Sequence, residues 1–420
     1  MMASAQMRGG PSRELPMSHI PSIEDRGRPD GVGRPADPGA NGLARAEQAQ
    51  SERLSHVQRD KAEALARQYP DDYELDRNGA LAIRGEVLVI GLSDKALAAA
   101  QKTGFSVVSR DVVDGLDLPM AVLSRSGWPL TKMIDRLRDI APDSMVEADH
   151  VFSMSGAAWP MGGSGAPDAN PGRAAGWRVG MIDTGSTPLP STGARIHMVQ
   201  QGFAPGGIVP HDHGTAVASI IARPALDDQA NGPSGTLFAA DIFGSGRRGG
   251  TAELMVRALG WMARQQVPVV NISMVGPYNG VVAAAIAVLV KRGTLIVAPV
   301  GNDGPSARLL YPASLKGVIA VTGVDTKGQL LPEASQVSRV DFAGPAVTAV
   351  RGISGRTVEM RGTSFASPVI AHHLAELLSA PDPRGARQAV QKLAGAAWKP
   401  KKGKSGLGSG IIGLAPMTSR

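Results

Sequence analysis

The sequence contains no cysteine among its 420 residues. Disulfides, thiolate zinc sites and cysteine nucleophiles are therefore excluded, while the compartment in which the protein works is left open. No apolar run reaches the roughly 18 residues that a membrane-spanning helix requires, so we expect no transmembrane segment. The first 30 residues lack the hydrophobic core of a signal peptide, so we expect no signal peptide in this sequence.

Aromatic residues make up only 4% of the chain, whereas glycine (52) and proline (31) are frequent. A chain rich in small apolar residues and turns is typical of α/β proteins. The formal net charge of +7 is mild for this length, and aromatic residues do not interleave with the basic ones. We therefore expect no binding of nucleic acid.

Composition divides the chain into several segments. Residues 1–43 are rich in Gly, Pro, Ser and charge and are predicted to be disordered. Residues 44–78 form a helical segment, in which 44–68 has few apolar positions and is predicted to be a solvated helix. Residues 155–176 are a Gly/Pro-rich linker between two more apolar regions.

Residues 79–154 alternate strands and helices in the order β-α-β-β-α-β, which is that of a small ferredoxin-like α+β domain. The helix at 93–104 has Ser93 as its N-cap and a glycine as its stop. This region holds no cluster of a nucleophile, a base or metal ligands, and its one histidine, His150, is interpreted as structural.

Residues 177–415 alternate apolar strands with helices. Strands that are apolar on both faces and are joined by helices favour a parallel, doubly wound sheet. The first of them, WRVGMID, ends at Asp183 and runs into Thr-Gly.

An Asp-Thr-Gly segment occurs in two unrelated kinds of protease. An aspartic protease needs two such aspartates to share a proton, and only Asp183 stands in such a segment here. That fold is also all-β, which this alternating pattern is not. The alternative is that Asp183 orients a histidine beside a nucleophilic serine.

Two segments downstream supply those partners. His213 lies in HDHGTAVASII and Ser364 in MRGTSFASP, each at the predicted start of a helix. A nucleophilic serine needs a base, and the base needs an orienting carboxylate. Because strand ends and helix starts meet at one edge of an open α/β sheet, we expect Asp183, His213 and Ser364 to converge there.

Five stretches, MIDTG, HGTAVASII, NISMVG, APVGNDG and GTSFASP, resemble the successive motifs of subtilisin-like serine proteases, in the family's order. The resemblance covers 177–415 and implies a mostly parallel sheet with helices on both faces. It also implies a serine endopeptidase that forms an acyl-enzyme on Ser364. The unit at 79–154 resembles the propeptides that fold such proteases and then block them, so the chain's own N-terminal domain is an expected chaperone and inhibitor.

The resemblance assigns roles to matched positions. Ser364 would be the nucleophile, His213 the general base and then acid, and Asp183 the group that fixes the tautomer of His213. Asn302 would donate its side-chain amide to the oxyanion, together with the backbone N–H of Ser364.

Polypeptide substrates would pair as an added strand with matched backbone edges. These edges and the pocket beside them comprise Gly249, Gly250, Ser273, Met274, Val275, Ala298, Pro299 and Val300. Valine stands at 275 where the family usually has glycine, which predicts a narrow pocket and a preference for small or medium residues; profiling a peptide library tests this. Asp303 could favour a basic side chain.

The chemistry requires no cofactor. Structural calcium is common in the family, but no loop dense in carboxylates locates it, and we assign no metal site. His211, beside His213, is interpreted as an exposed loop residue rather than half of a metal pair. We expect a monomer. The resemblance favours an extracytoplasmic or secreted enzyme, which the lack of a signal peptide does not support.

Two alternatives to an active enzyme stay open. One is a pseudoprotease that binds peptides without cutting them, although all four chemical groups are present in the sequence. The other is a zymogen held by residues 79–154, which would act mainly as a regulated partner.

Overall fold

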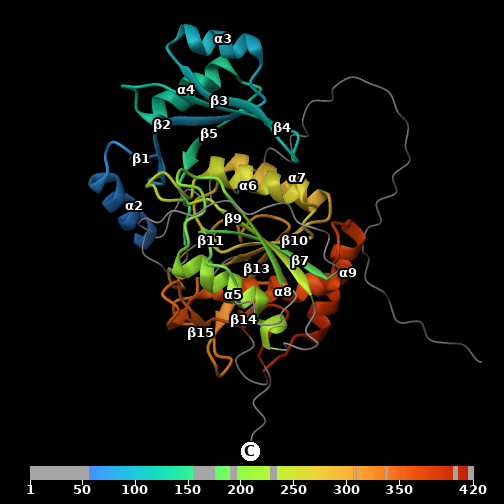
Figure 1. Cartoon of the computed structure of the whole chain (residues 1–420). Coiled ribbons are helices and arrows are strands. Elements are labelled where there is room, and N and C mark those ends of the chain that lie inside the picture. Colours follow the sequence, from blue (N-terminus) through green and yellow to red (C-terminus); the bar gives the residue numbers. More distant parts are fainter. Residues whose placement is uncertain are drawn as a thin grey trace, which may run out of the picture. The chain divides into compact units, whose positions relative to one another are not determined.

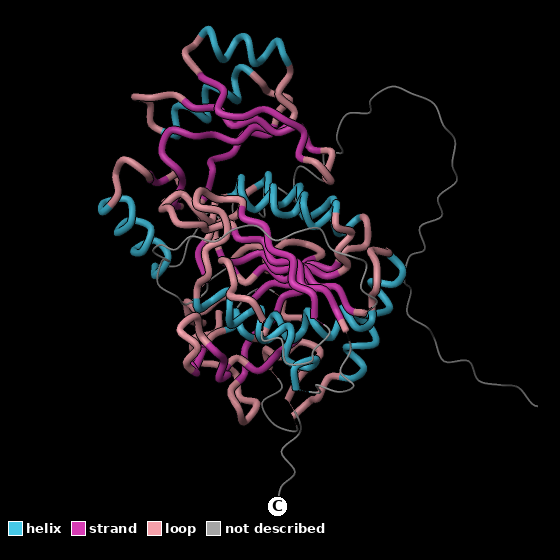
Figure 2. The backbone as a smooth tube through the Cα atoms, in the orientation of Figure 1, coloured by secondary structure: helices cyan, strands magenta, loops and turns pink. Residues whose placement is uncertain are grey.

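The computed structural model of the chain (Figures 1 and 2) describes residues 56–154, 176–189, 196–227, 234–305, 307, 310–335, 339–400 and 405–414. The predicted disorder at 1–43 and nearly all of the predicted linker at 155–176 lie outside these residues. The described residues all belong to one compact unit, Ala46–Arg420.

A seven-stranded sheet forms the centre of the larger part, and every pairing in it is parallel. Its strands, in spatial order, are β14 (Phe342–Pro345), β13 (Val318–Val324), β12 (Leu295–Pro299), β10 (Val269–Ile272), β7 (Trp177–Asp183), β9 (Gly235–Asp241) and β8 (Ile196–Gly202). After β9 the chain crosses to the other side of β7 to form β10, so the strand order reverses there. The crevice outside the carboxyl ends of the strands at such a point is where open α/β sheets bind ligands.

Helices cover both faces of this sheet, as predicted (Figure 1). One face packs on α6 (Ala252–Arg264) and α7 (Gly280–Lys291), and the other on α5 (Asp212–Asp227), α8 (Ser367–Leu377) and α9 (Pro383–Ala396). Successive residues of β7 face opposite ways: Ile182 belongs to the first of these cores and Met181 to the second. Burial on both faces explains why these strands read as continuous apolar runs.

A second sheet, of five antiparallel strands, is built from the N-terminal part of the unit (Figure 2). It contains β1 (Tyr73–Leu75), β2 (Leu81–Ile90), β3 (Ser106–Val113), β4 (Leu118–Ser124) and β5 (Met145–His150), with helices α3 (Asp94–Lys102) and α4 (Leu130–Ile140) on one face. The spatial order β3-β4-β2-β5 is that of the ferredoxin-like unit, which confirms this part of the fold prediction. Below, this sheet with its helices is called the N-terminal unit.

Strand β1 also pairs with β2, and it lies within residues 44–78, the segment predicted to be helical. The helix of that segment, α2 (His56–Gln68), was predicted to be solvated, which is wrong for one of its faces. Ala62 is buried against Tyr73 and Leu81 in a small apolar cluster. The apolar periodicity of this helix did not predict the contact, because it was judged from large apolar residues and alanine is small.

Strand β5 lies against the N-terminal ends of two helices of the larger part. Asp149 Oδ1 accepts a hydrogen bond of 2.9 Å from the backbone N–H of Glu253 at the start of α6. Glu147 Oε1 accepts one of 3.3 Å from Gly280 N–H at the start of α7. The first N–H groups of a helix lack partners within the helix, so these two side chains help to hold the N-terminal unit against α6 and α7 by accepting from them.

His150, predicted to be structural, belongs to the same contact. Its Nε2 lies 3.1 Å from Asp76 Oδ2, and its Nδ1 lies 3.0 Å from the side-chain nitrogen of Asn279. The side-chain Oδ1 of Asn279 caps α7 by accepting hydrogen bonds from Val281 and Val282 N–H. The histidine thus joins the N-terminal unit to the cap of α7.

Two small pairs of strands and a 3₁₀ turn complete the described chain. The two-residue strand β6 (Ser153–Met154) pairs with β11 (Met274–Val275), and β15 (Val347–Arg351) forms a hairpin with β16 (Thr357–Arg361). A 3₁₀ turn, η1 (Thr363–Phe365), precedes α8. Within the ranges described, no helix combines the length and the apolar character needed to cross a membrane.

The Asp149 contact predicts a pH dependence of stability. Burial raises the pKa of the Asp149 carboxyl to about 7, and nearby Glu253 and Glu86 add to the shift. The folded chain therefore retains a proton that the unfolded chain loses at about pH 4, so this group's contribution to stability falls as pH rises from about 4 to 7 and is constant above. We expect Asp149→Asn to remove a slope of up to about 1.4 kcal/mol per pH unit across that window.

Urea unfolding of Asp149→Asn between pH 4 and 8, in a Ser364→Ala background that lacks the predicted nucleophile, measures this. Asp94→Asn, at a carboxylate that is 91% exposed, is the control. Parallel stability curves for Asp149→Asn and its parent would show that the prediction is wrong.

Candidate active site

Asp183 is the last residue of β7, and its carboxylate is fully buried. Thr184 donates two hydrogen bonds to its Oδ1, from the backbone N–H at 2.7 Å and from the hydroxyl at 3.2 Å. The same hydroxyl accepts from Gly214 N–H at 2.9 Å, in the first turn of α5. Thr184 therefore ties the end of the strand to the start of the helix and fixes the direction of the carboxylate.

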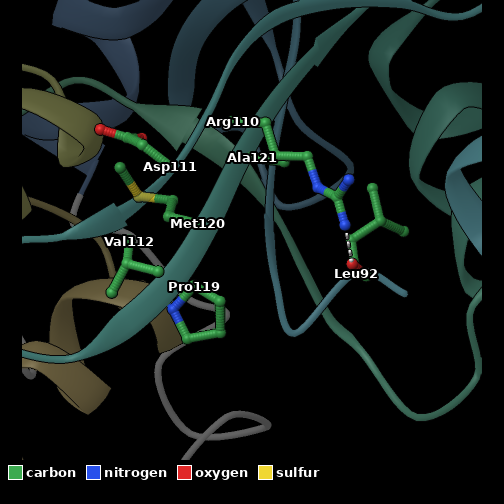
Figure 3. Close-up of a pocket in the computed structure, with 7 residues that line it drawn as sticks. All are labelled: Leu92, Arg110, Asp111, Val112, Pro119, Met120 and Ala121. Atoms are coloured by element: carbon green, nitrogen blue, oxygen red, sulfur yellow. Dashed lines mark hydrogen bonds between the residues drawn. The ribbon is translucent and has the colours of Figure 1, made fainter. Parts of the chain in front are cut away.

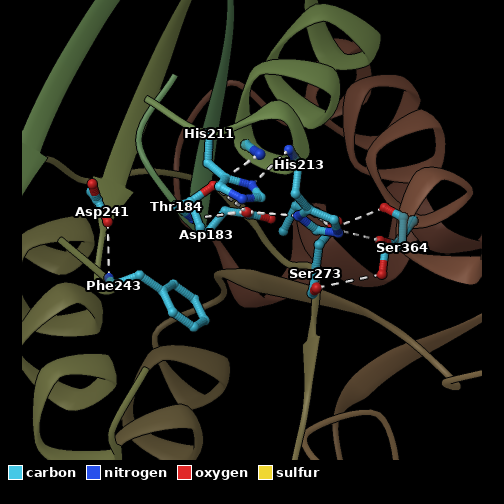
Figure 4. Close-up of polar contacts among 11 residues, drawn as sticks. Asp183, Thr184, His211, His213, Asp241, Phe243, Ser273 and Ser364 are labelled. Carbon is cyan, nitrogen blue, oxygen red and sulfur yellow. Dashed lines mark hydrogen bonds and ion pairs between the residues drawn. The ribbon is translucent and has the colours of Figure 1, made fainter. Parts of the chain in front are cut away.

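His213 is the second residue of α5, and its ring is 3% exposed. Nδ1 lies 2.8 Å from Asp183 Oδ1, so the carboxylate favours the tautomer with a proton on Nδ1 and leaves Nε2 able to accept one. The Phe365 ring packs beside the imidazole, 5.3 Å between centroids. In Figure 4 the imidazole lies between Asp183 and Ser364.

Ser364 lies in the 3₁₀ turn η1 and is buried. It was predicted to sit at the start of a long helix, but α8 begins only at Ser367, so this detail is wrong. The Ser273 hydroxyl donates to the Ser364 carbonyl at 3.0 Å, and the Ser364 hydroxyl lies 3.5 Å from the Ser273 carbonyl. These contacts fix the turn against the end of β10.

Asn302 lies in the loop that follows β12, and its side chain is directed at the turn that carries Ser364. Its Oδ1 accepts from Thr363 N–H at 2.9 Å, while the Thr363 hydroxyl accepts from Gly301 N–H at 3.2 Å. Gly362, with φ of 144°, adopts a backbone conformation that side chains disfavour, and a Cβ there would come within 2.8 Å of Asn302 Nδ2. The structure thus brings together all four predicted catalytic residues.

Both predicted substrate edges are occupied by the chain's own residues. Gly250 O accepts a hydrogen bond of 2.7 Å from Phe152 N–H, and Met274–Val275 pairs antiparallel with Ser153–Met154. The side chain of Phe152 is buried; a Cβ on Gly276 would come within 2.4 Å of its ring.

The remaining predicted contacts are placed as follows. Gly249 is buried beside the Phe243 backbone, and Ser273 directs its hydroxyl at the Ser364 turn rather than at the substrate edge. Ala298 and Pro299 end β12 and Val300 follows them, all three buried. A separate pocket on the N-terminal unit contains none of the predicted site residues (Figure 3); it is lined by Leu92, Arg110, Asp111, Val112, Pro119, Met120 and Ala121.

His211 was predicted to be exposed, but it is half-buried, and its Nδ1 accepts from His213 N–H at 3.3 Å. Burial lowers the pKa of His211, and the neighbouring His213 lowers it further. Over the described residues, no three histidine, aspartate or glutamate side chains are grouped so as to hold a metal ion.

Comparisons with known proteins identify relatives of this chain. Residues 210–406 match the model of the subtilase family of peptidases, Peptidase_S8. The chain is 29% identical over 233 residues to subtilisin DY of Bacillus licheniformis, which is 52% of this chain and 83% of that protein. It is 29% identical over 212 residues to a thermostable alkaline protease of Halalkalibacterium halodurans, 47% of this chain and 55% of that one.

Residues 210–406, which contain His213, Asn302 and Ser364, belong to the subtilase family. The subtilase is a serine peptidase, and catalysis in this family requires no cofactor. Among solved structures, it resembles fervidolysin from Fervidobacterium pennivorans, a keratinolytic enzyme related to subtilisin, with a TM-score of 0.60 at 18% identity. That likeness covers 81% of this chain and 62% of fervidolysin and establishes the fold.

Three residues in or beside this site were not predicted from the sequence. Thr184 orients Asp183, and Lys61 of α2 pairs with Asp303, next to Asn302, at 3.7 Å. Asp241 ends β9 directly beside Asp183. Of these three, only Asp241 had a signal in the sequence, because it follows an apolar strand segment as Asp183 does.

The Gly362 turn predicts a sensitive position. We expect Gly362→Ala to displace the Asn302 amide and to lower kcat of the subtilase by up to about 10²-fold, since a shift of about 1 Å in a catalytic group can cost that much. Gly395→Ala is the matched control, because a Cβ at that helical position meets nothing within 4 Å. Hydrolysis of a peptide substrate measures both; a folded Gly362→Ala enzyme with unchanged kcat would contradict the geometry described.

Proposed function

We propose that this subtilase is an endopeptidase that cleaves polypeptides through an acyl-enzyme on Ser364. The observation that supports this most strongly is the 2.8 Å contact between His213 Nδ1 and Asp183 Oδ1, with the imidazole lying between that carboxylate and Ser364. A base held in one tautomer, beside a serine held in a fixed turn, is what nucleophilic catalysis requires.

In the first half of the reaction, His213 Nε2 takes the proton of the Ser364 hydroxyl as Oγ bonds to the substrate's carbonyl carbon. The carbonyl π-electrons move to oxygen, and the Asn302 amide and the Ser364 N–H donate to that oxyanion. His213 then gives the proton to the leaving amine nitrogen as the C–N bond breaks. Asp183 stays ionised and stabilises the imidazolium that exists between these proton transfers.

In the second half, water attacks the acyl carbon while His213 again takes the proton. Collapse of the second oxyanion breaks the bond to Ser364 Oγ, which recovers its proton from the imidazolium, and the acid product leaves. The imidazolium forms transiently in both halves. Because Asp183 and His213 are buried, the charge interaction between them that stabilises the imidazolium is stronger than it would be in water.

The substrate strand is proposed to follow the path that residues 151–154 now take. Those residues pair with the edges at Gly250 and at Met274–Val275, as an extended peptide would. The matched pocket residues Ala298, Pro299 and Val300 are proposed to lie beside the residue that precedes the cleaved bond. A silent pseudoprotease is the alternative, and no contact among the described residues of the site favours it.

Loss of the nucleophile tests the mechanism. We expect Ser364→Ala to lower kcat by at least about 10³-fold and to abolish covalent labelling by a fluorophosphonate. Ser219→Ala, which removes a hydroxyl bonded to the Thr215 carbonyl within α5, should leave labelling intact. If Ser364→Ala retains labelling at the parental rate, or if the parent is never labelled, the proposal is overturned.

The N-terminal unit is further proposed to act as an intramolecular inhibitor and folding partner of the subtilase. Support comes from Phe152, which is buried at the substrate edge, and from Asp149 and Glu147, which contact the starts of α6 and α7. A substrate cannot use the same edges while residues 151–154 occupy them. Release of this segment is therefore proposed to precede activity.

This arrangement predicts self-cleavage shortly after Met154, within the Gly/Pro-rich stretch at 155–176. Mass spectrometry of the purified enzyme should find a new N-terminus in that stretch, while Ser364→Ala should stay uncleaved. A fully active enzyme that keeps its N-terminal unit covalently attached and bound would count against the inhibitory role.

An extracytoplasmic or secreted location, which the family resemblance favours, is also retained as a proposal. Cell fractionation tests it, and recovery of all activity in the cytosol would contradict it.

A further inference from the structure

A second carboxylate lies beside that of the proposed triad and has no role in the chemistry above. Asp241 is the last residue of β9, directly opposite Asp183 in the parallel register of β7 and β9. It is 1% exposed, and it belongs to none of the five motifs from which the family resemblance was drawn. Figure 4 shows Asp241 and the neighbouring Phe243 on the side of Asp183 away from Ser364.

The Asp241 carboxylate accepts hydrogen bonds from the backbone of three separate segments. Oδ2 accepts from Val209 N–H at 2.7 Å, and Oδ1 accepts from Phe243 N–H at 2.8 Å and Gly244 N–H at 3.0 Å. Gly185 N–H is a further donor. Burial raises the pKa of this carboxyl, and the four backbone donors oppose that effect by stabilising its charged form.

Each of these segments carries a part of the active site. Gly185 follows Asp183 and Thr184 directly, and Val209 lies four residues before His213. The segment that begins at Phe243 leads to Gly250, the edge that pairs with Phe152. A hydrogen bond of 3.0 Å from His211 N–H to Gly185 O joins the first two segments as well.

We propose that Asp241 is a positioning residue that holds the aspartate, histidine and substrate-edge segments of the site in their relative places. The proposal rests on the proposed function, because it assumes that Asp183 and His213 act on Ser364. Hydrogen bonds that connect loops remote from the reacting atoms would affect only stability. Here the three connected loops carry Asp183, His213 and Gly250, so displacement of any of them changes catalytic distances.

The test is Asp241→Asn, which keeps the shape of the side chain but replaces one acceptor oxygen with an NH₂ group that faces backbone N–H donors. We expect kcat per active site, counted by fluorophosphonate titration, to fall about 10–100-fold with KM changed by less than about 3-fold. Backbone amide exchange should accelerate in 203–211 and 243–250. A structural role alone would lower the melting temperature and leave kcat per titrated site unchanged.

The matched control is Asp341→Asn. Asp341 also accepts from a backbone N–H, that of Ala320 at 2.8 Å, but it precedes β14 at the opposite edge of the sheet. A loss of kcat in Asp241→Asn with a normal Asp341→Asn supports the proposal. Unchanged kcat per site in Asp241→Asn, or equal losses in the two variants, overturns it.

A second variant covers the case in which Asp241→Asn does not fold. In Gly185→Ala, a Cβ would come within 2.8 Å of Asp241 Oδ2 and 2.6 Å of Val209 O, so it disturbs the same contacts without a change of charge. We expect the same loss of kcat per site, and a folded Gly185→Ala enzyme with full kcat overturns the proposal. Failure of the parent enzyme to react at Ser364 would instead refute the proposed function, so the two failures are distinguishable.

Discussion

The hydrogen bond of 2.8 Å between His213 Nδ1 and Asp183 Oδ1 is the interaction on which the proposed chemistry depends. It forms because β7 ends where α5 begins, at the carboxyl edge of a parallel sheet whose strand order reverses beside β7. Both side chains are buried, so water does not weaken the bond by competing for it. The contacts of Thr184 and Asp241 hold the surrounding backbone, and together they leave one ring nitrogen directed at Ser364.

The main-chain edges that would bind a substrate are the same edges that hold residues 151–154. An added strand gains affinity from backbone hydrogen bonds that any sequence can make, and it gains selectivity from the side chains that enter pockets. In the proposed inhibited state, the buried Phe152 supplies the side chain, and Asp149 and Glu147 on β5 add hydrogen bonds at the starts of α6 and α7. In this proposal, residues 151–154 take the place of a substrate, and the N-terminal unit that precedes them adds a docking surface that a short peptide would lack.

Much of the fold could be predicted from the sequence because its signals are local. The strand that ends at Asp183 is a continuous apolar run, and the helix after Ser93 begins with an N-cap that the structure confirms through a 3.2 Å bond to Ala96 N–H. The meeting of Asp183 and His213 follows from topology alone, once strand ends and helix starts are assigned to one edge. Five motifs that match in the family's order supported the catalytic roles of Asn302 and Ser364, which neither residue could support alone.

The features that were missed depend on partners far apart in the chain. Strands β6 and β11 have two residues each, too few to show any periodicity, and they exist only because each supplies the other's hydrogen bonds. The packed face of α2 and the pairing of Lys61 with Asp303 likewise depend on residues far away in the sequence. Asp241 resembles any aspartate at the end of a strand until its four backbone donors are placed around it.

The most direct measurement of the central claim is the side-chain ¹⁵N NMR spectrum of the histidines, with His213 assigned by difference from His213→Ala. The account predicts that neutral His213 carries its proton on Nδ1, in a slowly exchanging hydrogen bond that Asp183→Asn abolishes. A neutral ring protonated on Nε2 would contradict the account. So would an Nδ1 proton that exchanges equally slowly in Asp183→Asn.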